Sequence, residues 1–371
     1  MHDDEEEMEL MVLNLGFNVQ DVTPLEKILA TADLFVKGPR PPVDKYDLKS
    51  YIFASTALKK ELYALLDNNL TTRVVELATG IEMPAEANKK PAYVLASAVM
   101  GFLIGAEFLI DPTMAIYEKA SSLGHEAAAE QLYKFRIADH IHPQAWIDIA
   151  LERETRISQD EIELAISYVM KDAPDIAETN FAKRLDIWKL NYYFVLKAAS
   201  LWRNEHCDVK AALAFIEWME SESFFNNIAA IFTLILFSPK RYGKMIKGIE
   251  STSAKKFRDG LKNAAWDLAY IRYWAKKYKD ADENSFWLLC SNDLALRRIA
   301  SCIFEDPELG EAHLLHILQH YWGQNKAKQI LKVYHQTWGR VASDEAARDA
   351  VLLPRFLNID DSIAAIEGQL A

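Results

Sequence analysis

The chain has 371 residues, 50% of them hydrophobic and 26% charged, so it is long enough for two or three packed units of ordinary globular composition. Its net charge of -12 argues against a surface that binds nucleic acid over its whole extent. The three cysteines form no CxxC pair, which argues against a disulfide framework and a structural zinc site.

The chain begins with MHDDEEEMEL, which is acidic where a secretory signal peptide would be basic. No apolar run reaches the roughly 18 residues of a membrane span. We therefore expect a cytoplasmic protein without a membrane partner. Residues 25–37 and 47–67 have helical periodicity, and the GPRPP sequence at residues 38–42 between them is the expected early linker. A second stretch of helix breakers, residues 80–91, precedes an apolar segment that ends at Asp111.

From Asp111 to about Phe237 the sequence is a series of amphipathic segments separated by prolines or short polar loops. The predicted helices are residues 112–123, 127–138, 160–171, 183–202, 209–220 and 227–237. Three more are predicted at residues 313–322, 325–338 and 344–353. No repeat of fixed period is present, so the pattern does not favour a solenoid.

Two short apolar segments interrupt the helical pattern, and each is followed by an aspartate and a helix. Phe108–Ile110 precedes Asp111, and Trp287–Cys290 precedes Asp293 by two residues. Functional groups of open parallel sheets gather at the carboxyl ends of the strands, so the two aspartates are candidates for one site. Asp is also a favoured N-cap, which leaves a purely capping role open for each.

A third aspartate, Asp267, lies in the apolar stripe of a predicted helix. At 100° per residue it falls among Ala264, Leu268 and Ile271 rather than opposite them. A buried charge is costly unless something compensates it, so Asp267 requires an explanation.

Basic residues are concentrated around Asp267. Between Ser238 and Lys279 the sequence contains twelve basic residues and three acidic ones. The residues that we predict to bind nucleic-acid phosphates are Lys240, Arg241, Lys244, Lys247 and Lys255. A solvated helix face is the alternative, and it is the more frequent explanation of such a charge run.

The combined pattern resembles the C-terminal half of PIN-domain and PIN-like nucleases. The shared order is a helix with an aspartate (NAAWD, residues 263–267), an apolar strand, and SND at residues 291–293 leading into a helix. The resemblance implies a predominantly helical α/β fold with a small parallel sheet, a PIN-like three-layer core and large helical additions. The segments that we expect are an acidic leader and helical region at 1–91, a PIN-like core with a helical insertion at 92–310, and a C-terminal helical region at 311–371.

The resemblance also implies a metal-dependent nuclease that hydrolyses RNA or single-stranded DNA, with RNA as the first expectation, and that acts as a toxin or phage-defence effector. Asp111, Asp267 and Asp293 would be its catalytic acids and the ligands of Mg²⁺ or Mn²⁺, which prefer carboxylate oxygen. The first motif of the family usually carries a polar residue, often Asn, two places after its Asp, and Thr113 occupies that place here. Candidates for a middle acid are Glu118, Asp139, Asp186 and Glu217.

The alternative function is a non-catalytic, mostly helical interaction or scaffold protein, in which the aspartates are caps and the basic stretch docks an acidic partner. A protein regulator and a homo-oligomer both remain open.

Two groups of histidines are weaker candidates for metal sites. Asp139, His140 and His142 lie on one short turn, without the usual helical spacing of ligands, so a turn or helix cap is favoured. A second group, His313, His316 and His320, shares a helical face with leucines and aromatic residues that can pack without a metal. The sequence contains no Gly-rich phosphate loop, GxSxG elbow or Rossmann fingerprint.

Overall fold

The computed structural model describes residues 16–38, 44–170, 180–181, 185–205, 208–240, 245–303, 310–343, 354 and 356–370. Within these ranges the chain is mostly helical and contains one four-stranded sheet. No helix in the described part combines the length and apolar character needed to cross a membrane. The predicted helix at residues 344–353 lies outside the described residues.

The first part of the chain holds η1 (Val19–Asp21), α1 (Val22–Ala32), β1 (Phe35–Lys37), α2 (Leu48–Thr56), β2 (Glu61–Leu66), α3 (Asn68–Ala78), α4 (Lys90–Gly105) and β3 (Leu109–Asp111). The middle part holds α5 (Thr113–Leu123), α6 (His125–Asp139), α7 (Pro143–Ala150), α8 (Gln159–Val169), α10 (Asp186–Glu205), α11 (Val209–Ser221), α12 (Asn227–Leu236) and α13 (Ala254–Asp280). The last part holds β4 (Ser285–Cys290), α14 (Leu294–Ser301), α15 (Gly310–Trp322), α16 (Gln324–Ser343) and α18 (Ile359–Leu370).

The sheet has the strand order β1-β4-β2-β3, and β2 runs parallel to both of its neighbours. The predicted sheet with strands at both apolar segments, 108–110 and 287–290, is therefore confirmed. The expectation of a parallel sheet needs a correction, because the edge strand β1 pairs antiparallel with β4 and makes the sheet mixed. In the register Leu66 lies opposite Cys290, so β2 and β4 end side by side.

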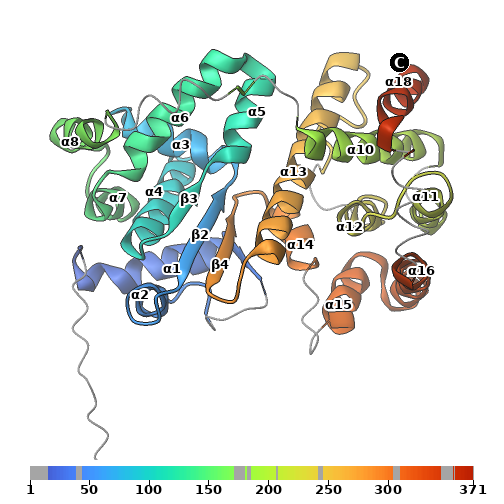
Figure 1. Cartoon of the computed structure of the whole chain (residues 1–371), viewed down its shortest axis with the longest axis horizontal. Helices are drawn as coiled ribbons and strands as arrows, with labels where there is room; N and C mark the ends of the chain where they lie inside the picture. Colours follow the sequence, from blue (N-terminus) through green and yellow to red (C-terminus); the bar gives the residue numbers. More distant parts are fainter. Residues whose placement is uncertain are drawn as a thin grey trace, which may run out of the picture.

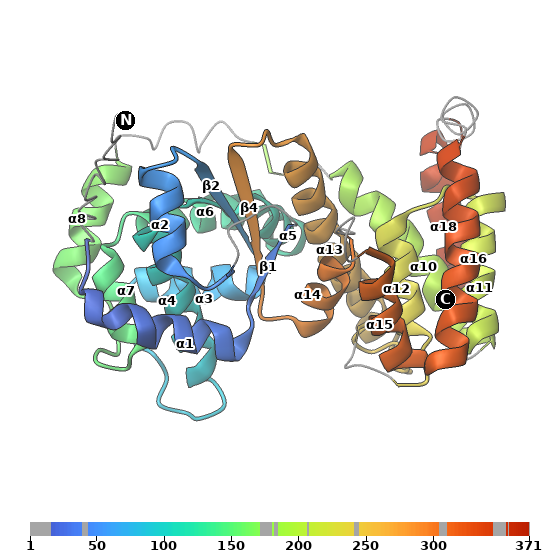
Figure 2. The ribbon, with the colours of Figure 1, turned by 90° about the horizontal axis from the view of Figure 1, so that it is seen from below.

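Helices cover both faces of the sheet, as Figure 1 shows with α4 and α7 on one side and α13 on the other. Side chains of a strand point alternately to opposite faces, so Leu62, Ala64 and Leu66 join the core beneath α1–α4. Leu65 and Leu289 join the second core, which contains buried residues of α5 and α10–α16. Figure 2 shows α10–α12, α15, α16 and α18 gathered beyond α13, at the far end from α1.

Two predicted helices are wrong over part of their length. The helix predicted at 25–37 ends at Ala32, since Asp33 has a left-handed backbone (φ 52°), and β1 follows. The helix predicted at 47–67 ends at Thr56, and after Lys59 (φ 53°) the chain forms β2. The sheet thus takes two of its strands from residues 1–91 and pairs both of them with β4.

Candidate functional site

Asp67 stands at the carboxyl end of β2 and is the N-cap of α3. Its carboxylate accepts hydrogen bonds from the Leu70 N–H (2.8 Å), the Ser291 hydroxyl (2.5 Å) and the Asn292 N–H (3.2 Å). Burial nevertheless raises the pKa of the Asp67 carboxyl, and the negative charge of Asp293 adds to this effect.

Asp293 occupies the equivalent place after β4. It is the N-cap of α14 and accepts hydrogen bonds from the Ala295 and Leu296 N–H groups at 2.8 and 3.1 Å. Its own N–H donates to the Ser291 hydroxyl at 2.9 Å, so Ser291 connects the two aspartates. This arrangement follows from the parallel pairing of β2 and β4, which brings the two strand ends to the same edge.

Two further carboxyls, from α13 and α5, lie close enough to Asp67 and Asp293 for the charges of these groups to affect one another. Burial raises the pKa of Asp267, on α13, well above its usual value, and the charges of Asp293 and Glu118 raise it further. Burial also raises the pKa of Glu118, on α5, to about 7, while its hydrogen bonds with Tyr270 (3.1 Å) and Asn68 act in the opposite direction. Within the described part of the chain, no side chain forms a hydrogen bond or ion pair with the Asp267 carboxylate.

We call Asp67, Glu118, Asp267 and Asp293 the acidic cluster. Glu118, Asp267 and Asp293 are only partly buried, so solvent reaches the cluster even though protein atoms enclose much of it. A cation or a polar ligand can therefore approach it.

Lys247 provides a positive charge on the α13 side of the cluster. The residue is exposed, and its charge lowers the pKa values of Glu118 and Asp267. Gly260 allows this placement, because a Cβ atom built there would lie 1.6 Å from the carbonyl oxygen of Lys247. Because Gly260 has no side chain, the backbone at Lys247 can pack directly against α13.

Arg297 provides a second cation, on α14. Its guanidinium donates to the backbone carbonyl of Ser291 at 2.7 Å, and its Nε atom is buried without a hydrogen-bond partner. Burial lowers the pKa of Arg297, whereas the charges of Asp33, Asp293 and Asp67 raise it. The acidic cluster is therefore flanked by one positive charge on α14 and another before α13.

The structure brings together two of the three aspartates that the sequence analysis selected, Asp267 and Asp293. Asp111 has different partners, because it accepts hydrogen bonds from the Tyr273 hydroxyl (2.9 Å) and the Thr113 N–H (2.8 Å). Asp67 takes the strand-end position nearest Asp293, and sequence reasoning missed it because residues 47–67 were assigned to one helix. The signal that could have found it is Asn69, the polar residue two places after Asp67.

The other predicted residues lie apart from the cluster or outside the described part. Among the four candidates for the middle acid, Glu118 belongs to the cluster, whereas Asp139 lies at the end of α6, Asp186 at the start of α10 and Glu217 on α11. Lys240 and Lys255 are exposed, and Arg241 and Lys244 lie outside the described residues. His142 caps α7 by accepting from the Gln144 N–H at 3.3 Å, as predicted for that turn.

Within the described ranges, no three His, Cys, Asp or Glu side chains are placed so that they could hold one ion together. In the acidic cluster, the carboxylates of Asp67 and Asp293 are turned toward backbone N–H groups. Binding of one ion by the whole cluster would therefore require these two side chains to exchange N–H donors for the ion.

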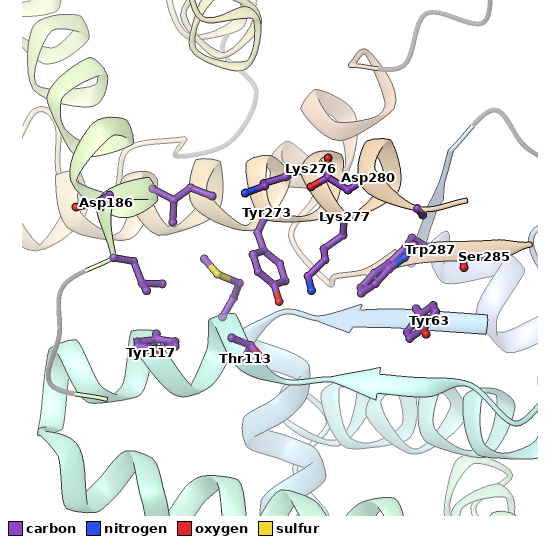
Figure 3. Close-up of a pocket in the computed structure, with 14 residues that line it drawn as sticks. Tyr63, Thr113, Tyr117, Asp186, Tyr273, Lys276, Lys277, Asp280, Ser285 and Trp287 are labelled. Carbon is purple, nitrogen blue, oxygen red and sulfur yellow. The ribbon is translucent and has the colours of Figure 1, made fainter. Parts of the chain in front are cut away.

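A pocket of about 680 Å³ lies between α13 and α5, over the face of the sheet that α13 covers (Figure 3). Tyr273 and Lys277 point into it from α13, and Thr113 and Tyr117 form the opposite wall. Tyr273 is one helical turn from Tyr270, whose hydroxyl contacts Glu118. Successive turns of α13 therefore contribute residues to the acidic cluster and to the wall of the pocket.

No family model, curated protein or solved structure matches the chain. Proposals about its function therefore depend on the chemistry of these residues.

Proposed function

We propose that the protein is a PIN-like, metal-dependent nuclease whose active site is the acidic cluster. The observation that carries this proposal is the meeting of four carboxyls from four separate elements at the carboxyl ends of β2 and β4. Burial and mutual repulsion disfavour the charged forms of these groups, which is a stability cost that proteins commonly accept at functional sites.

The donor atoms are of the kind that binds Mg²⁺ or Mn²⁺, and binding of one ion by the whole cluster requires Asp67 and Asp293 to exchange their N–H donors for the ion. All four side chains offer carboxylate oxygen, which hard divalent cations prefer, and the Asp267 carboxylate has no hydrogen-bond partner among the described residues. Asp267 and Glu118 would hold the ion, together with Asp67 and Asp293. When bound, the ion would orient an attacking water and neutralise charge on the leaving oxygen of a phosphodiester.

The surrounding residues have separate tasks in this proposal. Lys247 and Arg297, whose charges act on members of the cluster, would contact phosphates of the substrate and reduce its repulsion from the carboxylates. Tyr270 holds Glu118 through its hydroxyl, and Ser291 holds Asp67. These bonds keep the carboxyls in place before substrate binds, which limits the reorganisation that catalysis requires.

The substrate class is RNA, with single-stranded DNA as the second candidate, in the setting of a toxin or phage-defence effector. Phosphate contacts carry no sequence information, so Lys247 and Arg297 would favour nucleic acid without selecting a sequence.

A structural role without catalysis is the competing function. It is favoured by the capping bonds of Asp67 and Asp293, which satisfy backbone N–H groups at two helix starts. In that case the chain would be an interaction or scaffold protein, and Asp267 would stabilise the packing of α13.

The test is incubation of the purified protein with labelled RNA and single-stranded DNA, in Mn²⁺ and in chelator. We expect cleavage by the wild type in Mn²⁺ only, and at least about a hundredfold less cleavage by the Asp267→Asn variant. Asp259→Asn is the matched control, because Asp259 is an exposed aspartate on the same helix. Equal cleavage by both variants would show that the acidic cluster does not carry the activity.

A further inference from the structure

The ammonium group of Lys277 is held between two aromatic rings in the pocket of Figure 3. It lies 5.3 Å from the ring centroid of Tyr273 and 5.5 Å from that of Trp287. Within the described part of the chain it forms no ion pair with a carboxylate. A cation that is fixed by rings and has no bound anion is well prepared to contact an anionic ligand.

Aromatic surface lies beside this cation. Tyr63 and Trp287 are opposite each other in the register of β2 and β4, and their rings stack at 4.6 Å with an angle of 7°. Trp287 is buried beneath this contact, whereas Tyr63 is partly exposed. Tyr117, on the α5 wall, is also partly exposed. The pocket thus combines a fixed cation with accessible ring surface.

The pocket continues across the edge of the sheet. A second pocket of about 600 Å³ shares Tyr63, Thr113, Tyr117, Lys277 and Trp287 with the first. It extends past Leu109 on the edge strand β3, a residue that is 58% exposed, to Arg136 on α6. The two pockets form one groove, and Lys277 lies where they meet.

The charges of the groove are not uniform. Asp186 lines the end toward α10, which disfavours an anion there, whereas Asp280 lies at the other end, one helical turn after Lys277 (Figure 3). Asp111 and Asp139 line the second pocket, where Asp139 pairs with Arg136 at 3.5 Å. A phosphate is therefore expected at Lys277, rather than along the whole groove.

We propose that this groove binds single-stranded nucleic acid, with a phosphate at Lys277 and the bases of neighbouring nucleotides against the rings of Tyr117 and Tyr63, which lie on either side of Lys277 (Figure 3). Base faces can stack on aromatic side chains only when they are not already stacked within a duplex, so the occupant is single-stranded. The inference rests on the proposed function in one respect, that the strand continues past Tyr273 and Tyr270 to the acidic cluster.

The test measures binding of a short labelled oligouridylate in chelator, where a metal-dependent activity is silent. We expect Lys277→Gln to weaken binding by about three- to tenfold and to reduce the salt slope by about one. Tyr117→Ala should weaken binding by about fivefold or more. Lys279→Gln is the matched control, since Lys279 is an exposed lysine on the same helix that lines neither pocket, and it should bind like the wild type.

Wild-type affinity in both Lys277→Gln and Tyr117→Ala would overturn the proposal. If Tyr117→Ala does not fold, the affinity of the Lys277→Gln variant alone decides whether the proposal stands. Uridine monophosphate that binds as tightly as the oligouridylate would also overturn it, because the groove would then hold a free nucleotide. Groove-dependent binding in chelator without any cleavage in Mn²⁺ would contradict only the proposed nuclease function.

Discussion

The hydroxyl of Ser291 donates a 2.5 Å hydrogen bond to the carboxylate of Asp67, a residue 224 positions away in the sequence. The same hydroxyl accepts the Asp293 N–H at 2.9 Å. Ser291 is fully buried between the ends of β2 and β4, so one hydroxyl sets the relative positions of two members of the acidic cluster.

Replacing Ser291 with Ala should destabilise the fold. The variant removes a donor from a buried carboxylate and an acceptor from the Asp293 N–H, so the free energy of unfolding should fall by about 1–3 kcal/mol. Urea unfolding at neutral pH measures the change. Ser122→Ala is the control, since that hydroxyl is exposed and bonds only to the Lys119 carbonyl of its own helix; it should change stability by less than about 0.5 kcal/mol. Equal effects of the two variants would contradict the proposed role of Ser291.

Neutralising Asp267 separates the catalytic and structural accounts. In chelator at pH 8, Asp267→Asn should raise the free energy of unfolding by about 1 kcal/mol or more, because it removes a partly buried charge that three other carboxyls repel. Mn²⁺ should raise the melting temperature of the wild type but not that of the variant.

A structural charge would behave in the opposite way. Removing one partner of a buried ion pair typically costs about 3–5 kcal/mol. A strongly destabilised Asp267→Asn protein that is indifferent to Mn²⁺ would therefore favour the scaffold alternative.

The stability of the metal-free protein should depend on pH through Glu118. Its folded-state pKa of about 7 lies above the value of about 4.3 expected in the unfolded chain, so between these values the folded state holds a proton that the unfolded state has released. The contribution of Glu118 is therefore greatest below pH about 4.3 and is lost as the pH rises to about 7, by at most about 1.4 kcal/mol per pH unit.

Comparison of the wild type with Glu118→Gln isolates this effect from the other titrating groups. Gln retains an acceptor for the Tyr270 hydroxyl, so the difference in unfolding free energy between the two proteins should grow in favour of the variant from pH 5 to pH 7. A difference that is constant over this range would mean that Glu118 is already ionised in the folded protein.

The sequence was informative where local pattern and tertiary structure agree. Trp287–Cys290 is a short apolar run rich in bulky residues, and burial in the sheet keeps it a strand, so β4 and the position of Asp293 were predictable. Asp267 was identifiable because a single carboxylate interrupts an otherwise apolar stripe of α13.

Asp67 was not predictable by the same reasoning. The residues of β2, ELYALL, include several strong helix formers, and local propensity favoured continuing the preceding helix. The strand forms because β3 and β4 pair with both of its edges, and those partners are distant in the sequence. Glu118 was one of four equal candidates, because only the packing of α5 against α13 distinguishes it from the others.

Lys247 should matter more than the other described lysines of the basic stretch. Lys247→Gln removes the positive charge nearest Glu118 and Asp267, so it should weaken binding of single-stranded RNA by about threefold or more at low salt. Lys255→Gln, an exposed lysine at the start of α13, is the matched control. Titrations at two salt concentrations measure both; equal losses in the two variants would indicate a diffuse basic surface instead of a phosphate contact at the cluster.

Metal-dependent cleavage in the Asp67→Asn and Asp111→Asn variants tests the central claim most directly, because it asks which strand-end aspartate belongs to the active site. Both changes keep an amide oxygen that can cap a helix start. With labelled single-stranded RNA and Mn²⁺, the account predicts cleavage by the wild type and by Asp111→Asn, and at least a roughly hundredfold loss in Asp67→Asn. Wild-type cleavage by Asp67→Asn, or no Mn²⁺-dependent cleavage by any of the three proteins, would contradict it.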